Sequence, residues 1–439
     1  MSSWISKELG EVCKTSSGGT PLRSKTEYYK GNIPWIKSGE LDKGIIYDSE
    51  EHISEEAVKK SSAKIFPTNT ILIALYGATI GKLAILGVPA TTNQAVCGIY
   101  QNSIFEPNFL FNYLFHKKQK LIEQGTGGAQ PNISQTILKR LPVPIVPLPE
   151  QRAIVSKIEQ LFSELDNGIA NLKSAKEKLE VYRQSVLQKA FEGELTKVSM
   201  TKIPLKELML NKPQNGLYKP NSEYGSGTKI IRIDGFYDGD ILEHYEYQRV
   251  NLNNDEIEKY SIQEGNILVN RVNSMSHLGK CGLVSKINEP TVFESNIMKI
   301  DIDFSSAISF YIKYYLSSLK GREELTKNAK QAVNQASINQ TDVGNTMVPH
   351  CLLNEQRQIV QEIESRLLVA DKLSESIIES LDKSEALRQS ILKKAFSGEL
   401  LTEKELEACM QEADWEPAEK LLERIHVGEK VKTKNLSNA

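Results

Sequence analysis

Two stretches of this chain read almost alike: YRQSVLQKAFEGEL at residues 182–195 and LRQSILKKAFSGEL at residues 387–400. Shifting the sequence by about 205 residues aligns 148–195 with 353–400 without a gap, and roughly 20 of 48 aligned positions are identical. A match of that length does not arise by chance. The chain therefore contains two copies of one unit.

Shorter matches extend the repeat upstream, with small changes of register that loop insertions explain. They pair NISQ (132–135) with SINQ (337–340), NTILIA (69–74) with GNILVN (265–270), and GKLAIL (81–86) with GKCGLV (279–284). Each copy also starts at a K-E-L sequence and finishes at A-F-x-G-E-L. The repeated unit is thus a whole domain followed by a long segment.

The composition is that of an ordinary soluble protein. The chain has 439 residues, too many for one hydrophobic core, with 40% hydrophobic and 25% charged residues. It contains no run of eighteen apolar residues, and its first residues lack a basic segment followed by an apolar one, so we expect neither membrane insertion nor secretion. The five cysteines are scattered and never form C-x-x-C. A reducing cytoplasm is therefore expected, without a disulfide framework or a zinc site.

The expected secondary structure changes once within each copy. Residues 1–147 and 200–350 contain short β-rich runs separated by Gly, Pro, Asn and Asp clusters, which is typical of mixed α/β domains. A patch with aromatic residues at helical spacing lies near the end of each region, at 109–122 and 310–325.

Each copy then continues as a helix of about 43 residues, or roughly 65 Å if straight. Pro149 suits the first turn of the first helix, and Asn354 is placed to cap the second. Gly193 and Gly398 fit the carboxyl ends, where positive φ is needed. We predict an α+β fold with a pseudo-two-fold internal repeat. Its parts are α/β domains at 1–147 and 200–350, spacer helices at 148–199 and 351–402, and a tail with a short helix at 403–439.

Heptad patterns predict how the two helices pack. The first helix carries one column at Ile158, Leu165, Leu172, Leu179 and Val186, and another at Leu161, Gly168, Ala175 and Tyr182. The second is less regular, with Ile359, Ile363, Ala370, Leu373, Ile377, Leu387 and Ile391. Small residues at Gly168, Ala175 and Ala370 would permit close approach. We expect an antiparallel coiled coil, because the domain between the helices can return the chain to its starting point.

No catalytic pattern is recognisable. The histidines have no metal-binding spacing, GATIGK (77–82) is too short for a phosphate loop, and GTGGAQ (125–130) does not match a dinucleotide loop. The tetrapeptides of adenine amino-methyltransferases are also missing. We therefore predict a binding protein with no catalytic residues, no metal and no bound cofactor.

Several small polar and basic residues near strand ends suggest DNA as the ligand. Arg and Lys suit guanine edges and phosphates, and Asn and Gln suit adenine. The net charge is −2, but residues 1–147 carry an excess of about four positive charges. The alternative is that the amides cap turns. The candidates are Lys37, Ser38, Tyr76, Thr79, Lys82, Gln130 and Asn132 in the first copy, and Arg232, Asn270, Arg271, Asn273, Ser274, Lys280, Gln335 and Asn339 in the second.

Nearly the whole chain resembles the specificity subunit of type I restriction-modification systems. The resemblance rests on PEQRAIVSKIEQLF and NEQRQIVQEIESRL, each followed by a K-A-F-x-G-E-L finish. GGTP at 18–21, IPWIKSGEL at 33–41, LPVPIVPLPEQ and DWEPAEKLLERI at 414–425 also match. The second copy has IIRIDGF at 230–236 in place of the WIKSG form, and its helix entry has lost most prolines.

The resemblance implies a non-catalytic subunit. Two target-recognition domains would each read one half of a bipartite, asymmetric DNA site, and the helices would set the spacer between the halves. Two modification subunits that bind S-adenosylmethionine and methylate adenine N6 would dock on the helices. Two restriction subunits that use ATP and Mg would then join.

Three alternatives remain open at this point. The chain could recognise DNA for another multi-subunit, methylation-based defence system. It could be a stand-alone DNA-modifying enzyme, although no segment outside the two copies offers a catalytic part. It could also be a scaffold whose coiled coil only joins proteins.

Overall fold

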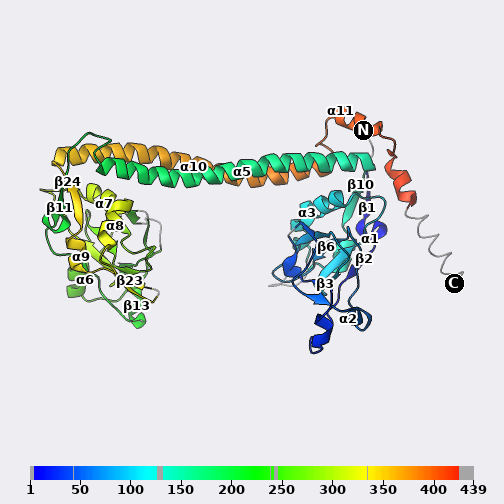
Figure 1. Cartoon of the computed structure of the whole chain (residues 1–439), viewed down its shortest axis with the longest axis horizontal. Coiled ribbons are helices and arrows are strands. Elements are labelled where there is room, and N and C mark those ends of the chain that lie inside the picture. The colour runs from blue at the N-terminus through cyan, green and yellow to red at the C-terminus, as the bar shows by residue number, and fades with distance from the viewer. Residues whose placement is uncertain are drawn as a thin grey trace. The chain divides into compact units, whose positions relative to one another are not determined.

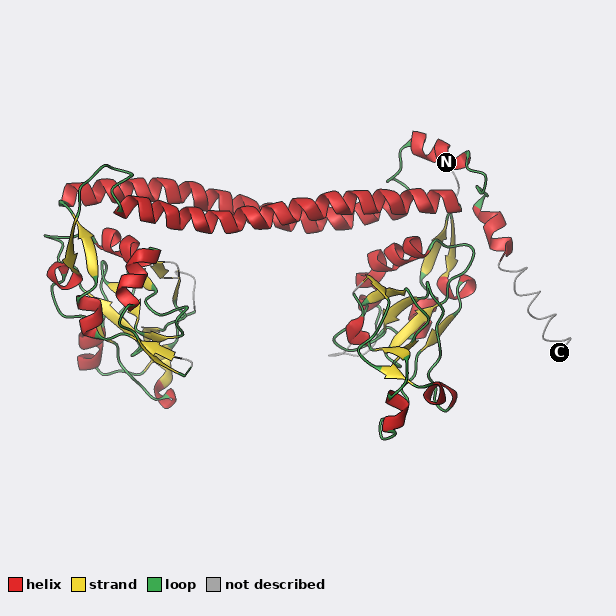
Figure 2. Ribbon diagram, viewed as in Figure 1, coloured by secondary structure: helices red, strands yellow, loops and turns green. Residues whose placement is uncertain are grey.

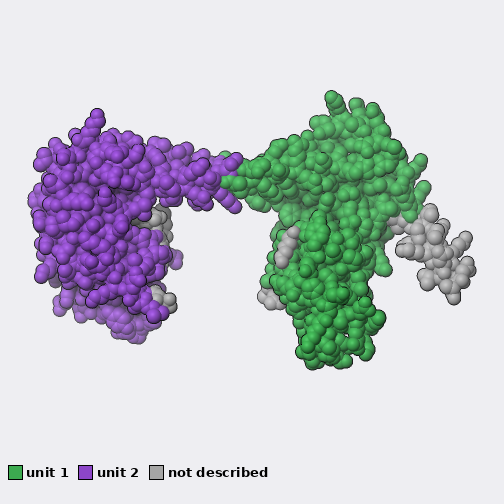
Figure 3. Space-filling model, viewed as in Figure 1, with its two compact units in different colours: residues 1–170, 381–439 green, residues 171–380 purple. Residues whose placement is uncertain are grey.

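The computed structural model describes residues 4–42, 44–125, 132–237, 239–241, 246–333 and 335–424. The chain divides into two compact units, residues 1–170 with 381–439 (unit 1) and residues 171–380 (unit 2) (Figure 3). Each unit contains one mixed α/β domain and one half of each of two long helices, α5 (Leu148–Phe191) and α10 (Leu353–Ser397) (Figure 1).

The domain of unit 1 is built on small sheets with helices beside them (Figure 2). A five-stranded sheet has the order β2-β9-β6-β7-β4, a three-stranded sheet the order β5-β3-β8, and β1 pairs with β10. The elements are β1 (Ile5–Glu8), α1 (Leu9–Val12), β2 (Thr15–Ser17), β3 (Ile33–Ile36), β4 (Gly44–Ile46), β5 (His52–Ile53), α2 (Glu55–Lys59), β6 (Ile71–Ala74), β7 (Leu83–Leu86), β8 (Thr91–Thr92), β9 (Val96–Ile99), α3 (Pro107–Glu123), α4 (Gln135–Lys139) and β10 (Pro142–Ile145).

The domain of unit 2 has a similar topology, with a sixth strand in the large sheet and one additional three-stranded sheet. Its sheets have the orders β12-β21-β17-β19-β15-β14, β16-β13-β20 and β18-β23-β22, and β11 pairs with β24. The elements are β11 (Thr201–Pro204), β12 (Gln214–Asn215), β13 (Tyr224–Ile231), β14 (Phe236–Tyr237), β15 (Gly239–Ile241), β16 (Arg249–Val250), α6 (Asn254–Tyr260), β17 (Ile267–Asn270), β18 (Val272–Asn273), β19 (Cys281–Leu283), β20 (Thr291–Phe293), β21 (Ile297–Ile300), α7 (Ser309–Ser317), α8 (Leu319–Thr326), β22 (Lys330–Ala332), β23 (Gln335–Ser337), α9 (Gln340–Gly344) and β24 (Met347–His350).

The ends of the long helices belong to the domain cores. In unit 1, Ile154 and Ile158 of α5 and Leu392 of α10 are buried in one cluster with the strands of the domain. In unit 2, Ile359 of α10 and Leu187 of α5 occupy the equivalent cluster. The two helices therefore run antiparallel, as the sequence predicted. Hydrophobic burial anchors them to the domain core in each unit.

One ion pair occurs at equivalent places in the two units. Arg388 binds Asp166 in unit 1, and Arg183 binds Asp371 in unit 2. Both arginine side chains are about three-quarters buried, with exposures of 20% and 24%. Since Arg183 and Arg388, like Asp166 and Asp371, are aligned by the repeat, the same contact is made once in each unit.

The second heptad column differs from the prediction. Gly168 and Tyr182 are exposed, and a Cβ at Gly168 would meet nothing within 4 Å, so the predicted close approach there is wrong. A column with less exposed residues follows the first at four residues and includes the half-buried Ile169 and Arg183. The second column of a heptad can follow the first at three or at four residues. A charged residue such as Arg183 makes the four-residue column difficult to recognise in the sequence.

The expected caps are partly confirmed. Gly193 and Gly398 end the helices with φ of 79° and 80°. Asn354 does not cap α10, because the helix already begins at Leu353. Instead, Glu355 accepts a hydrogen bond from the Leu352 N–H at 2.9 Å.

A buried glutamine joins each helix to its domain. The Gln151 amide donates to the carbonyls of Ile104 (2.8 Å) and Val146 (2.7 Å), and its oxygen accepts from the Glu106 N–H at 2.8 Å. Gln356 repeats these contacts with Ser306, Cys351 and Ile308 at 3.2, 3.0 and 3.0 Å. The glutamine of the repeated E-Q-R sequence is thus part of the fold.

The C-terminal segment covers the start of α5. Arg152 binds Asp414 and Glu412 at 2.8 and 3.0 Å, and Lys157 binds Glu405 of α11 (Glu403–Met410) at 3.0 Å. Hydrogen bonds from the Thr402 backbone and Lys157 lower the pKa of Glu405 to about 2. Ala418 and Leu421 complete the contact by entering the core of unit 1.

We predict that Gln356→Leu destabilises unit 2. The change leaves two carbonyls and one N–H without their buried partner, at a cost of about 2–4 kcal/mol. Urea denaturation followed by circular dichroism measures the loss. Gln358→Leu, exposed on the same helix turn, should have little effect, and equal stability of the two variants would contradict the assignment.

Candidate nucleic-acid interface

In both domains a hairpin with an equivalent closing hydrogen bond follows the buried strand, β6 or β17. The N–H of Gly81 donates to Ala74 at 2.8 Å, and that of Gly279 donates to Asn270 at 2.9 Å. Gly81 and Gly279 have φ of 73° and 75°, a conformation that glycine adopts without steric cost. The hairpins therefore share a frame, while the residues between its ends differ.

Each hairpin lies beside the amide-rich segment of its own domain. Tyr76 pairs with Asn132 as an isolated antiparallel bridge, and Val272 pairs with Ser337 at the aligned position. The Ile133 N–H donates to Leu75 at 2.8 Å, and the aligned Ile338 N–H to Arg271 at 2.9 Å. Two candidate segments that are far apart in the sequence thus form one surface in each domain.

The first hairpin leaves its candidate side chains accessible. Tyr76 and Asn132 are exposed, and Thr79 is half-buried. The ammonium of Lys82 lies 3.2 Å from Asp42, so a carboxylate already accompanies this cation. Gln130 lies outside the described residues.

The second hairpin is held more tightly. Arg322 of α8 donates from Nε to the Leu278 carbonyl at 2.9 Å and also bonds the Ser276 carbonyl. The Ser274 hydroxyl lies 3.0 Å from His277 Nδ1, and the Asn273 side chain accepts from the Ser274 N–H at 2.8 Å. Lys280, at the hairpin's end, is half-buried.

Two candidates lie at the base of this hairpin. Asn270 is 1% exposed, and its Oδ1 is buried without a hydrogen-bond partner among the described residues. Arg271 is half-buried and donates from Nη1 to the Ser295 carbonyl at 2.9 Å. Asn270 is therefore withdrawn from the surface, whereas Arg271 remains partly accessible.

The amide candidates of the second copy divide into two kinds. Gln335 is exposed on β23. Asn339 instead caps α9, since its Oδ1 accepts from the N–H groups of Thr341 and Asp342 at 2.8 and 3.1 Å. For Asn339 the turn-cap alternative accounts for the side-chain oxygen, while the side chain stays exposed.

A second pair of equivalent positions lies at the end of the small sheets. β3 and β13 are the central strands, each with one antiparallel and one parallel neighbour. Comparison of the two sheets, strand by strand, aligns Lys37, directly after β3, with Arg232, directly after β13. It also aligns Glu51 with Gln248, which contact Lys37 at 3.2 Å and Arg232 at 2.8 Å. Both domains therefore present a cation oriented by an acceptor from the antiparallel strand.

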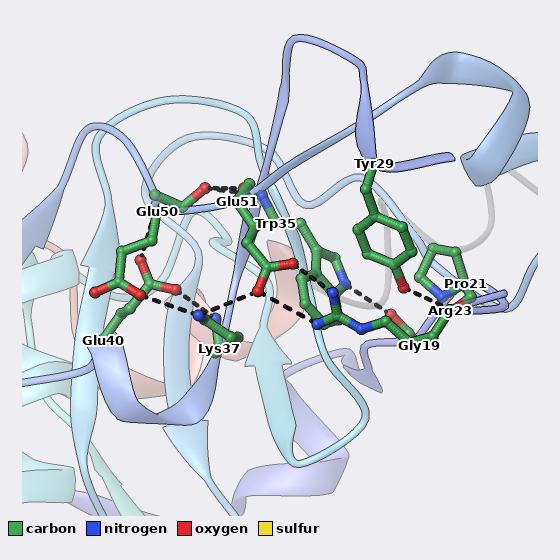
Figure 4. Close-up of polar contacts among 10 residues, drawn as sticks. Gly19, Pro21, Arg23, Tyr29, Trp35, Lys37, Glu40, Glu50 and Glu51 are labelled. Atoms are coloured by element: carbon green, nitrogen blue, oxygen red, sulfur yellow. Dashed lines mark hydrogen bonds and ion pairs between the residues drawn. The ribbon is translucent and has the colours of Figure 1, made fainter. Parts of the chain in front are cut away.

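Buried carboxylates fix the backbone at these cations. Glu40, 4% exposed, accepts from the N–H of Lys37 at 2.9 Å, within the short 3₁₀ turn Ser38–Glu40 that contains the candidate Ser38 (Figure 4). Glu294, 7% exposed, accepts from the Ile233 N–H at 2.8 Å and binds Arg232 at 3.2 Å. Hydrogen bonds donated by its ammonium group to Glu50 and Glu51 raise the pKa of Lys37.

Sequence reasoning missed Arg23, Glu51 and Glu294. Glu51 joins two cations, because it also binds Arg23, at 2.5 Å (Figure 4). The hydrogen bond from Arg23 is the main cause of its lowered pKa. The only advance signal was the concentration of basic residues in 14–37, which no spacing rule connects to Glu51.

The described residues contain no group of His, Cys, Asp and Glu side chains suited to a metal ion. Within the same residues, every helix is too short or too polar to cross a membrane. The recurring surfaces are built from amides, hydroxyls and partly neutralised cations, a donor and acceptor set suited to base edges and phosphates.

Comparison with known proteins agrees with this reading. The model of the type I restriction modification DNA specificity domain matches residues 1–174 and 189–383. The specificity subunit of the type I restriction enzyme EcoKI of Escherichia coli K12 is 25% identical over 417 residues, which are 90% of this chain and 89% of that protein. The MjaIX specificity subunit of Methanocaldococcus jannaschii is 35% identical over 183 residues, 40% of this chain and 41% of that protein.

Solved structures show the same fold. A chain from a study of complex assembly and conformational transition of the type I R-M system has a TM-score of 0.70 at 20% identity, covering 90% of this chain and 98% of that one. The HsdS subunit of Thermoanaerobacter tengcongensis has a TM-score of 0.57 at 21% identity, covering 90% and 97%. With family-model matches in both copies, the chain belongs to the type I restriction-modification DNA specificity family, the non-catalytic DNA-recognition subunits of these systems.

Proposed function

We propose that each α/β domain reads one half of a bipartite, asymmetric DNA site, and that α5 and α10 set the number of unread base pairs between the halves. The observation that carries the proposal is the pair of equivalent surfaces. Hairpin and strand-end cation recur in both domains, but their side chains differ, as two different half-sites require. Both half-sites must face the protein, so their centres are about one helical turn, roughly 10 base pairs, apart or a little more.

The proposed contacts are the candidate side chains that keep exposed or half-buried polar groups. In the first domain they are Lys37, Ser38, Tyr76, Thr79, Lys82 and Asn132; in the second, Arg232, Arg271, Asn273, Ser274, Lys280 and Gln335. The buried Asn270 would instead help to hold the second hairpin in place. Hydrogen bonds to base edges would give specificity, and contacts of lysines with phosphates would fix the register on the duplex.

The duplicated helices also account for the proposed partners. Residues 148–195 and 353–400 offer two similar surfaces, which suits two copies of one modification subunit. Those subunits would bind S-adenosylmethionine and methylate adenine, and two restriction subunits would bring ATP and Mg. The assembly would act in the cytoplasm, where its DNA is.

Lengthening both helices should lengthen the spacer. One heptad inserted after Ser174 and one after Glu379, both within the helices, adds about 10 Å while preserving the seam, equivalent to roughly three base pairs. We expect single-molecule sequencing of N6-methyladenine, in cells with the partner subunits, to show a longer spacer and unchanged half-sites. Lys178→Ala, exposed on α5, should leave the spacer unchanged. Altered half-sites with the original spacer would contradict the role of the helices.

Asn339 offers a test of cap against base contact. Asn339→Ala should destabilise α9 by about 1 kcal/mol, whereas Asn339→Ser, which can still cap, should restore most of that stability. Thermal unfolding measures both variants. If Asn339→Ser relaxes the methylated motif at one position despite normal stability, Asn339 contacts a base as well.

A further inference from the structure

Arg23 is held in one orientation by three side chains. Its guanidinium lies 4.3 Å from the ring centre of Tyr29 and 4.7 Å from that of Trp35 (Figure 4). Both terminal nitrogens donate to the Glu51 carboxylate, at 2.5 and 3.3 Å. Stacking and a bidentate ion pair together restrict a side chain that is otherwise among the most flexible in proteins.

The loop that carries Arg23 is also fixed. The Trp35 indole N–H donates to the Gly19 carbonyl at 2.9 Å, and the Tyr29 hydroxyl to the Pro21 carbonyl at 2.7 Å. A Cβ at Gly19 would lie 2.4 Å from the Ser62 backbone, so the loop packs against that segment more closely than any other residue allows. The two aromatic rings that stack on Arg23 thus also tie down the loop before it.

Arg23 nevertheless remains available to a ligand. Its side chain is 53% exposed. The contact with Glu51 uses two of the five guanidinium N–H donors, and the described residues offer no other acceptor to the remaining three. A residue that served only to stabilise the loop would not need to leave three guanidinium N–H groups exposed to solvent.

The surroundings favour a polyanion. Residues 14–37 contain five cations and one carboxylate, a net charge of +4. Lys14 lies over the ring of Tyr100 and Lys25 over that of Tyr28, each at 5.1 Å. Cations placed on aromatic rings in this way are pre-oriented, which lowers the entropic cost of binding.

The second domain follows the same backbone path without this arginine. The N–H of Gly216 donates to Ile297, as that of Gly18 does to Val96, both at 3.0 Å. The chain then continues through the 80% exposed Tyr218 and has no arginine before β13. A contact present in one domain alone is what a side chain that reads one half-site requires.

We propose that Arg23 reads a guanine in the half-site bound by the first domain, an inference that rests on the proposed function. Its free N–H donors match the O6 and N7 acceptors of guanine in the major groove. Glu51 acts as a positioning residue: its carboxylate holds the guanidinium of Arg23 in one orientation and also contacts Lys37.

The test uses Arg23→Lys in the complete complex, with methylated motifs determined by single-molecule sequencing. Lysine keeps the charge and loses the fork, so one G·C position in one half-site should become degenerate, with discrimination there reduced about tenfold or more. The other half-site and the spacer should not change. Arg232→Lys is the matched control, because any relaxation it causes must fall in the opposite half-site.

Four results would count against the proposals. An unchanged motif for Arg23→Lys, or a uniform loss of methylation at every sequence, would overturn base reading by Arg23. A lowered thermal unfolding midpoint with a uniform loss would assign Arg23 to the loop's structure. A wild-type chain that directs no bipartite methylation would instead overturn the proposed function itself.

Discussion

The structure depends on the antiparallel seam between α5 and α10. Neither long helix can bury its apolar face along its whole length against the domain of its own copy. In each unit, one half of α5 therefore packs against one half of α10. Burial of Ile158 and Leu392 in one core, and of Leu187 and Ile359 in the other, anchors both ends. The two equivalent Arg–Asp pairs add a polar contact inside that seam.

The duplication separates what must be repeated from what can differ. The buried glutamines, the strand pairings and the positive-φ glycines recur in both copies because they hold the frame. The residues supported by that frame do not recur: lysine and arginine follow the two central strands, and a short hairpin in one domain corresponds to a longer, arginine-braced hairpin in the other. A fixed frame with variable side chains lets one topology recognise two sequences.

Much of the fold could be predicted because its signals were local or repeated. The helices, their terminal glycines and the antiparallel pairing follow from periodicity and duplication. The phase of the second heptad column could not, because Arg183 occupies a seam position through its pairing with Asp371, a contact made across the fold. For the same reason, the sequence did not reveal that Asn339 caps α9, and Arg23 became a candidate only once folding brought Tyr29, Trp35 and Glu51 around it.

The C-terminal segment breaks the pseudo-symmetry at one place. Arg152, at the start of α5, binds two carboxylates of that segment. Arg357, its equivalent on α10, is exposed and has no acidic partner among the described residues. No second segment of that kind follows the first copy, because the chain leads directly from α5 into β11. The start of α5 is therefore covered by the C-terminal segment, whereas the start of α10 keeps an exposed arginine, so the duplicated helices present unequal surfaces at their starts.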